Sequence, residues 1–501
     1  MRNAARLILC IGMSSATFVF APRVASAQTI DDPSIFDCRD IDLYQVDQQE
    51  NLLASQKMIA CGRAAPGNPD VAENDGPFTD DYGGTDIDII TGKETWHHMT
   101  HSESMVWGYG STIVVQYNDS SEAPSCYAGI STSIDGGATF TRIQPSPLCT
   151  GHGRNFGDPI VVHNDALGLW FTGDIATGCG GAGFGLWTSP DGLNWDVGAC
   201  AYNSSNGDRE SMWVDNNPAS PYYGRMYISL NDFARGQRIY VTYSDDGTTW
   251  SPGVQVTSGF IRNIQLTGSS ESDGAVGIAG MDERGGGSTR VNWWYSSLDG
   301  GDTWTATPMG PEFPAPGERL CGYFWAIRPI WRHMGWGQPA YSPGGVVHYA
   351  YAGRGVNAND LGDIYYIRSE DNGATWSKAV VLNSDSAEGG TNAQWMPSVS
   401  ATADGKVFVT WYDRRDSTDG TNYQYWGIQS TDNGLTWLAD MPVSDALSPQ
   451  PLQPDGAIQS CYAGDYNYAS TVGTTHLVTW TDGRTLDKGR SHQNVYFDQV
   501  P

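Results

Sequence analysis

Four arginines recur along this chain in similar local settings: Arg154, Arg209, Arg262 and Arg332. A guanidinium group can hold a carboxylate with two parallel hydrogen bonds, so arginines that point to one centre would form a binding site for an acidic ligand. Such a cluster would also offset the repulsion that an anion meets from a chain with a net charge of −28. The same negative charge disfavours nucleic acid and anionic membrane surfaces as partners.

Seven short polar segments contain these arginines and the other candidate site residues. The further candidates are Asp158, Glu210, His333, Gln394, Trp395 and Tyr466, with Tyr462 as an alternative to Tyr466. Carboxyl, phenol and imidazole groups can transfer protons, and amide and indole groups can bind a sugar. An alternative interpretation is that these polar groups satisfy backbone atoms or line a water-filled channel. Polar residues at the same position in all seven segments favour a ligand site.

A repeated turn sequence, Ser-x-Asp-x-Gly-x-Thr-Trp or a form one residue shorter, indicates which elements position these segments. Its six copies contain Asp135, Asp191, Asp246, Asp299, Asp371 and Asp432, which lie 53 to 72 residues apart. This spacing suits a four-stranded antiparallel sheet with its loops. In each copy the aspartate can accept hydrogen bonds from backbone N–H groups of the turn. We therefore interpret these aspartates as structural rather than catalytic.

The repeated turn resembles the Asp-box, or BNR repeat, of the sialidase superfamily, and the resemblance extends from about residue 85 to the end of the chain. It implies an all-β fold, a β-propeller in which each polar segment leads into the innermost strand of a blade. The sequence predicts seven blades, with six as the alternative. The seventh blade has no Asp-box, and residues 85–90 are predicted as its fourth strand because apolar and polar residues alternate there.

The resemblance also implies a secreted enzyme that removes a terminal acidic sugar from glycoconjugates or polysaccharides, as exo-sialidases do. Three of the arginines would hold the sugar carboxylate. Tyr466 would be the nucleophile, Glu210 its base and Asp158 the acid/base that protonates the leaving group. A tyrosine suits this attack because an anionic nucleophile would be repelled by the carboxylate of the substrate. The F/Y-R-I-P motif of sialidases is absent from the sequence.

Two other functions are alternatives. A uronate-specific lyase would neutralise a sugar carboxylate and remove the adjacent proton. The groups that could do this are Arg332, His333, Asn263, Gln265 and Tyr466. A non-catalytic propeller would instead bind a glycan or a protein through aromatic surfaces, for which Trp331, Trp336 and Trp395 are candidates.

The N-terminal part of the chain differs from the repeats. Residues 1–27 have the pattern of a secretory signal peptide, residues 28–84 are predicted as an extension with a helix over 48–60 and a linker, and residues 85–501 form the propeller. The predicted disulfides are Cys38–Cys61, Cys126–Cys149, Cys179–Cys200 and Cys321–Cys461. We expect an exported monomer, extracellular or alternatively periplasmic, that does not insert into a membrane.

No cofactor is predicted. His97, His98 and His101 are close in sequence, but without a second cluster we favour loop hydrogen bonding over a metal site. The acidic stretch 79–86 is a candidate for structural calcium. The Asp413–Arg415 and Asp482–Arg484 stretches occupy equivalent positions in the last two blades, and we predict that their Asp and Arg side chains pair and fix blade edges.

Overall fold

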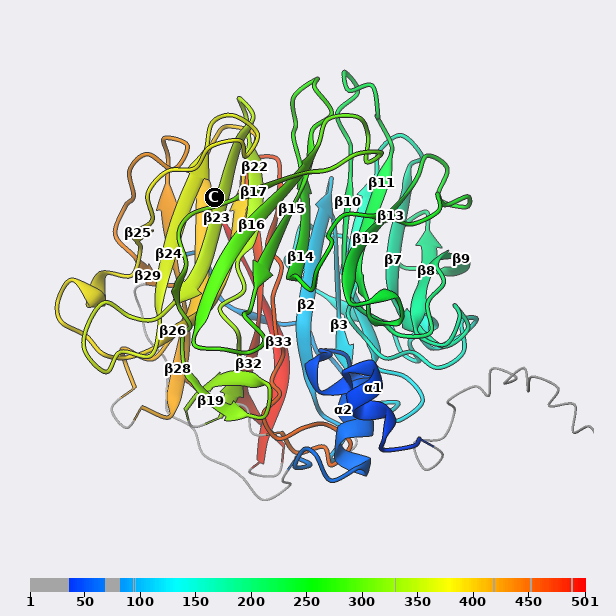
Figure 1. The fold of residues 1–501 in the computed structure, drawn as a ribbon, viewed down its shortest axis with the longest axis horizontal. Coiled ribbons are helices and arrows are strands. Elements are labelled where there is room, and N and C mark those ends of the chain that lie inside the picture. Colours follow the sequence, from blue (N-terminus) through cyan, green and yellow to red (C-terminus); the bar gives the residue numbers. More distant parts are fainter. Residues whose placement is uncertain are drawn as a thin grey trace, which may run out of the picture.

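The computed structural model describes residues 36–67, 82–92, 94, 96–328, 330–417, 420–450, 453–487 and 490–501. The predicted signal peptide and most of the predicted linker lie outside these ranges. Within them the chain is mostly β-sheet, and the helices are short (Figure 1). No helix in these ranges is long and apolar enough to cross a membrane.

Seven antiparallel sheets of four or five strands follow one another along the described chain (Figure 1). The first sheet contains β2 (His101–Tyr109), β3 (Thr112–Asp119), β4 (Ala128–Ser133) and β5 (Thr141–Arg142). The second contains β6 (Ile160–Asn164), β7 (Leu169–Ala176), β8 (Gly183–Ser189) and β9 (Asp196–Tyr202). The third contains β10 (Gly207–Val214), β11 (Met226–Asp232), β12 (Arg238–Ser244) and β13 (Val254–Gln255).

The next three sheets repeat this pattern, two of them with an added strand. The fourth contains β14 (Arg262–Gly268), β15 (Val276–Asp282), β16 (Thr289–Ser297), β17 (Thr305–Pro308) and β18 (Phe313–Pro314). The fifth contains β22 (Gln338–Ser342), β23 (Val346–Gly353), β24 (Asp363–Ser369) and β25 (Val380–Val381). The sixth contains β26 (Gln394–Ala401), β27 (Val407–Asp413), β28 (Asn422–Ser430), β29 (Met441–Pro442) and β30 (Ser448–Pro449).

The seventh sheet joins the two ends of the repeat region. It contains β31 (Ser470–Val472), β32 (Thr475–Asp487), β33 (Arg490–Val500) and β1 (Ile87–Asp88), with Ile87 opposite Phe497. The prediction that residues 85–90 supply the missing fourth strand is therefore confirmed, although β1 itself has two residues. The first strands of the seven sheets contact one another in chain order, and β31 also contacts β2.

The repeated turns have the predicted hydrogen bonds. In the first copy, the carboxylate of Asp135 accepts from the backbone N–H of Thr139 at 2.9 Å and from the Thr139 hydroxyl at 2.6 Å. These two bonds, followed by one from Ser133, lower the pKa of Asp135 to about 2. Gly137 occupies the left-handed region at φ 92°, which other residues rarely adopt. Carboxylates that are engaged in this way hold the turn together.

The structure also agrees with other sequence-based predictions. All four predicted disulfides are present, which fits an oxidising compartment. The Nη2 atoms of Arg415 and Arg484 lie 2.7 Å from Asp413 and Asp482 respectively, as the predicted pairing requires.

Two features lie outside the repeats. A small sheet of β19 (Glu318–Cys321), β20 (Phe324–Ile327) and β21 (Trp331–Arg332) is inserted between the fourth and fifth sheets and was not predicted. The N-terminal extension forms α1 (Asp40–Tyr44), a 3₁₀ turn at Val46–Gln48 and α2 (Leu52–Ala60). Short 3₁₀ turns also occur at Pro147–Cys149, Phe233–Arg235 and Ser384–Ser386. Figure 1 shows α1 and α2 at one end of the sheets, on the same side as β19.

Candidate functional site

Three of the four predicted arginines converge on one residue, Glu50. Arg209 Nη1 lies 2.8 Å from Glu50 Oε2, and Arg262 Nη2 bonds to Oε1. Arg332 Nη2 donates to the backbone carbonyl oxygen of Glu50 at 2.9 Å. The arginines belong to β10, β14 and β21, whereas Glu50 belongs to the N-terminal extension. Each of these four residues has an exposed fraction of at most 1%.

Irregular backbone at the start of the first strands positions several residues around this centre. Five residues at equivalent places have φ between 54° and 62°: Glu103, Asp158, Arg209, Asn263 and Met396. The strand register shifts at four of them, the exception being Asp158, which precedes β6. Left-handed backbone is uncommon for residues other than glycine, and β-bulges redirect side chains. Because such conformations cost energy and cluster at functional sites, their recurrence here marks a candidate site.

Acidic residues bind both the arginines and the segment around Glu50. Asp465 accepts two hydrogen bonds from the Arg332 guanidinium, one of them at 2.9 Å from Nε. Asp208 accepts from the backbone N–H groups of Glu50 at 3.0 Å and Asn51 at 3.1 Å. The segment around Glu50 is thus bound through its backbone as well as its side chain.

The arginine charges act differently on the nearby carboxyl groups. Burial alone would raise the pKa of Glu50, but the charges of Arg262 and Arg209 hold it below its ordinary value. Burial, and then the negative charge of Asp465, raises the pKa of Glu103 to about 8. Burial, and then Glu103, raises the pKa of Asp158 well above its ordinary value. The arginines therefore stabilise an ionised carboxylate at the position that Glu50 occupies, whereas burial and neighbouring negative charge favour the protonated forms of Glu103 and Asp158.

Tyr466 lies against this cluster. Its ring centroid is 3.8 Å from the Arg209 guanidinium carbon. Its buried hydroxyl has no hydrogen-bond partner among the described residues. Burial, followed by the charges of Glu103 and Asp158, raises the pKa of Tyr466 well above its ordinary value. Asp158 Oδ2 accepts from the backbone N–H of Arg209 at 2.9 Å, so the structure places Tyr466, Asp158 and Arg209 next to one another.

The predicted pairing of Tyr466 with Glu210 stays a prediction, because Glu103 also acts on Tyr466. Burial, and then the charges of Asp208 and Asp174, raises the pKa of Glu210, which identifies its acidic neighbours. The carboxyl group whose charge acts most strongly on Tyr466 is that of Glu103. The Glu103 carboxylate also accepts from the backbone N–H of Asp465, the residue before Tyr466, at 2.8 Å. Glu103 is therefore a second candidate for the acidic neighbour of Tyr466.

Arg154 and His333 lie apart from the arginine cluster. Arg154 is partly exposed, and its Nη2 donates to the carbonyl oxygen of Pro124 at 2.8 Å. His333 Nδ1 accepts from the backbone N–H of Gly335 at 3.2 Å. Burial, and then the charge of Arg290, lowers the pKa of His333 to about 3. His333 is therefore a neutral, buried residue next to Arg290, rather than a base within the cluster.

Gln394 and Trp395 also have surroundings that the sequence-based hypothesis did not foresee. Gln394 Nε2 donates to Asp385 at 3.0 Å and to Asp413 at 3.2 Å, which links the start of β26 to the end of β27 and to the 3₁₀ turn at Ser384–Ser386. Trp395 is fully buried and stacks on Tyr412. Trp331 and Trp336 are buried as well. Trp331 and Trp395 are therefore part of the core, whereas the Trp336 ring centroid lies 5.5 Å from the guanidinium carbon of Arg209 and 5.2 Å from that of Arg262.

Hydrogen bonds engage two of the clustered histidines. His98 Nδ1 lies 2.8 Å from Asp455, and His101 Nδ1 lies 2.7 Å from the carbonyl oxygen of Gln493. Within the acidic stretch 79–86, Asp86 pairs with Arg484 at 2.6 Å, and residues 79–81 lie outside the described ranges.

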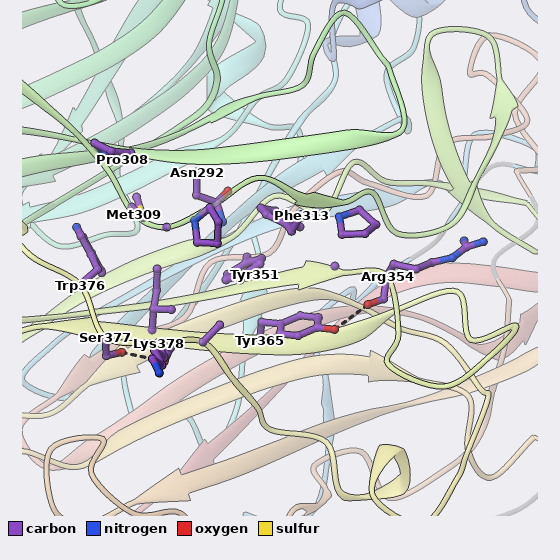
Figure 2. A pocket seen from close by; sticks show the side chains of 16 residues that line it. Asn292, Pro308, Met309, Phe313, Tyr351, Arg354, Tyr365, Trp376, Ser377 and Lys378 are labelled. Atoms are coloured by element: carbon purple, nitrogen blue, oxygen red, sulfur yellow. Dashed lines mark hydrogen bonds between the residues drawn. The ribbon is translucent and has the colours of Figure 1, made fainter.

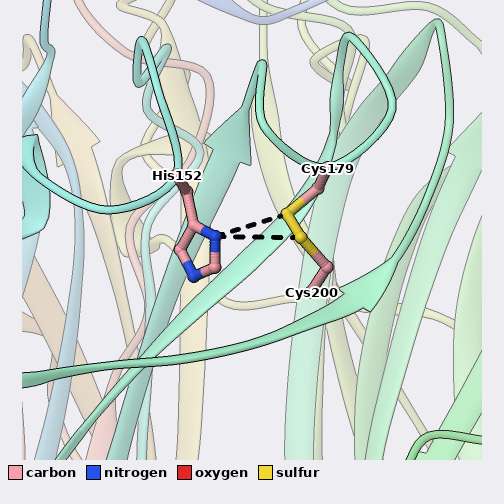
Figure 3. A group of neighbouring side chains, drawn as sticks. All are labelled: His152, Cys179 and Cys200. Atoms are coloured by element: carbon pink, nitrogen blue, oxygen red, sulfur yellow. Dashed lines mark hydrogen bonds between the residues drawn. A yellow bond between two sulfur atoms is a disulfide. The ribbon is translucent and has the colours of Figure 1, made fainter.

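Another group with ligand-type side chains is His152, Cys179 and Cys200. Figure 3 shows His152 Nδ1 directed at the Cys179–Cys200 disulfide, 3.7 Å from each sulfur. Zinc binds deprotonated thiolates, and these sulfur atoms are bonded to each other. The group is therefore a packed disulfide rather than a metal site.

Two pockets lie between and among the sheets. One of 500 Å³ lies between β16–β18 and the fifth sheet and is lined by Tyr351, Tyr365 and Trp376 (Figure 2). In it the Tyr365 hydroxyl donates to the Arg354 carbonyl oxygen at 2.7 Å. A cavity of 190 Å³ lies among the first strands of six sheets and reaches Tyr468. The arginine cluster itself is filled by the extension.

The raised pKa of Glu103 predicts how stability depends on pH. Folded Glu103 keeps its proton up to about pH 8, whereas the unfolded chain releases it near its ordinary value of 4.5. The free energy of unfolding should therefore fall as pH rises between these values, and Asp158 and Glu210 act in the same direction. Glu103→Gln should reduce this fall by on the order of 2 kcal/mol. Denaturant unfolding at pH 5 and pH 8 measures it.

The control for this measurement is Glu370→Gln, because the Glu370 side chain is exposed. We expect its pH profile to match that of the wild type. A Glu103→Gln profile identical to that of the wild type would show that folded Glu103 is ionised over this window.

Comparison with known proteins gives only distant likenesses. No protein-family model matches the chain, and no curated protein matches it. A protein of unknown function from Dyadobacter fermentans is 11% identical with a TM-score of 0.42, over 84% of this chain and 99% of that one. An ulvan lyase is 14% identical with a TM-score of 0.48, over 85% of this chain and 96% of that one. A Hadza microbial sialidase is 14% identical with a TM-score of 0.40, over 81% and 66% of the respective chains. At these values the likenesses assign this chain neither a family nor an activity.

Proposed function

We propose that this chain is a secreted, seven-bladed β-propeller enzyme that acts on a glycan bearing a carboxylate, which Arg209, Arg262 and Arg332 bind. The observation that carries the proposal is the convergence of these three buried guanidinium groups on Glu50, whose carboxylate two of them hold. The blade number is supported by the contacts of the seven first strands in chain order and by the pairing of β1 with β33.

For a hydrolase, the residues around this arginine clamp fit the roles of a retaining glycosidase. Asp158 is held protonated and can donate its proton to the leaving-group oxygen. The Tyr466 oxygen then attacks the anomeric carbon and transfers its proton to the Glu103 carboxylate. Burial is the largest cause of the raised pKa of both Glu103 and Asp158, so water entering an opened site would lower both pKa values. The charges of Arg209 and Arg332 would then favour ionised Glu103, whereas the charges of Glu103 and Glu210 would still favour protonated Asp158. Hydrolysis of the tyrosyl intermediate completes the reaction, with Asp158 as base.

A second candidate function, uronate lyase, is favoured by the position of Tyr466 over Arg209. A base beside the carboxylate-binding guanidinium is well placed to take the proton on the carbon that bears the carboxylate. An ionised Tyr466 would take this proton, the electron pair of the C–H bond would form a C=C bond as the glycosidic C–O bond breaks, and the leaving oxygen would receive the proton of Asp158. Asn263, whose Oδ1 accepts from Arg209 Nη2 at 3.3 Å, would help to neutralise the carboxylate.

The test compares Tyr466→Phe with Tyr468→Phe. Because the Tyr466 hydroxyl has no partner among the described residues, its removal should not unfold the protein. The Tyr468 hydroxyl donates to the Glu210 carbonyl oxygen at 3.3 Å, which makes Tyr468→Phe a matched control. The assays measure free sialic acid released from a sialylated glycoprotein and unsaturated uronate formed from ulvan and other uronate polysaccharides.

We expect one product from the wild type and from Tyr468→Phe, and at least about a hundredfold less from Tyr466→Phe. Release of sialic acid would establish the hydrolase, and an unsaturated product would establish the lyase. If no form, including Glu50→Gln, yields either product, the result would contradict an enzymatic function. It would favour a non-catalytic glycan-binding or protein-binding propeller.

A further inference from the structure

The arginine clamp, formed by Arg209, Arg262 and Arg332, is covered by the N-terminal extension of the same chain. Arg209, Arg262 and Glu50 have exposed fractions of 0%, and that of Arg332 is 1%. No external carboxylate can reach these guanidinium groups while Glu50 stays in place. The residue that fills the clamp belongs to the N-terminal extension, which is separate from the repeated sheets.

We infer that residues 36–67 form an intramolecular inhibitor whose Glu50 carboxylate occupies the place of the substrate carboxylate, so that an acidic glycan must displace this segment in order to bind. This inference rests on the proposed function, because it takes the clamp to be the site for the glycan. The segment binds as a ligand would. Each oxygen of the Glu50 carboxylate engages a different arginine, and the backbone at Glu50 contacts Arg332 and Asp208.

The contacts on either side of Glu50 hold the segment over the site. Asn51 caps α2 and also donates through its side chain to Asp208. Leu52 and Leu53 pack with Phe156, Tyr127 and other buried residues at the ends of the first two sheets. Further along, Ser55 accepts from the backbone N–H of Gln459 at 3.0 Å. The segment is therefore docked through a polar anchor and a small apolar patch.

The disulfide pattern leaves the segment free to separate. Cys38–Cys61 closes within the segment, and the three other disulfides join residues beyond position 125. Of the described disulfides, none therefore ties the extension to the sheets. A pocket of 540 Å³ lies along the boundary, between Asp47, Met58 and Arg63 of the segment and the β19–β20 hairpin. The extension is thus a folded, internally crosslinked unit with an incompletely packed edge.

The electrostatics agree with a displaceable carboxylate. Among the acidic groups described at this centre, Glu50 has a lowered pKa, whereas Glu103, Asp158, Asp208 and Asp465 have raised ones. The arginines thus favour negative charge at the Glu50 carboxyl group more than at the other four carboxyl groups. A sugar carboxylate bound there would gain the same interactions once Glu50 has left.

The experiment measures binding of N-acetylneuraminate and of glucuronate to the full chain by titration calorimetry. Glu50→Gln removes the competing charge, and we expect one probe to bind this variant at least about tenfold more tightly than the wild type. Cys38→Ser/Cys61→Ser leaves the clamp intact but loosens the segment, so it should strengthen binding of the same probe. Asp42→Asn removes an exposed carboxylate of the same segment and should leave the affinity unchanged.

Hydrogen exchange of the α2 amides provides a readout independent of catalysis. A saturating probe should speed exchange across α2, because displacement exposes Leu52 and Leu53 to water. Equal probe affinity in the wild type and in both variants, with unchanged exchange in α2, would overturn the inhibition and leave the clamp standing. Failure of both probes to bind to either variant would overturn the clamp and the inhibition together.

Discussion

Arg209→Ala should destabilise the folded protein by about 3–5 kcal/mol, because it leaves the fully buried Glu50 carboxylate without one of its two arginine partners. A buried charge that loses its partner retains the full cost of its removal from water. The variant also removes the contact between the guanidinium and the Tyr466 ring. Denaturant unfolding with the disulfides intact measures the effect.

A double-mutant cycle separates the ion pair from loss of packing. Glu50→Gln combined with Arg209→Ala should cost less than the sum of the two single changes, because the second substitution removes the charge that the first leaves unpaired. Arg284→Ala is the control, because its ion pairs with Asp282 and Glu312 are exposed and should contribute less than about 1 kcal/mol. Additive effects of the two substitutions would show that Glu50 and Arg209 do not interact in solution.

Trp331→Ala should cost a further large amount of stability, about 3–5 kcal/mol, because it opens a cavity among buried rings. Trp331 is fully buried, contacts the rings of Trp395, Tyr412 and Tyr423, and donates its indole N–H to the Gly464 carbonyl oxygen at 2.9 Å. Thermal unfolding measures the loss. The partly exposed Tyr223 provides the control, since Tyr223→Ala should change the stability little. A Trp331→Ala variant with wild-type stability and weakened glycan binding would instead support the role of a sugar platform.

The repeats made most of the fold predictable from the sequence. The aspartates of the repeated turns fix where a strand pair turns, so the first strands and the sheet boundaries could be placed from their spacing. The alternation of residues 85–90 identified the edge strand that pairs with β33. Short separations between cysteines gave three of the disulfides, and the two remaining cysteines gave Cys321–Cys461.

The site was less predictable because its decisive contacts come from outside the repeats. Glu50 lies in the extension, and its only signal in the sequence is a polar stretch before a helix N-cap at Asn51. Arg154 shares the repeat position of the other arginines, yet its side chain bonds to Pro124. The bulge at Arg209 lets two successive side chains, those of Asp208 and Arg209, both contact Glu50, and residue types alone do not specify where a bulge occurs.

The most direct test of the carboxylate clamp is a crystal structure of Glu50→Gln grown with N-acetylneuraminate and, separately, with glucuronate. The account predicts electron density for a sugar carboxylate between the guanidinium groups of Arg209 and Arg262, with residues 36–67 displaced. If neither sugar occupies this position and the substituted side chain at position 50 remains bound between the two arginines, the result would contradict the clamp. It would identify the arginine cluster as a buried structural element.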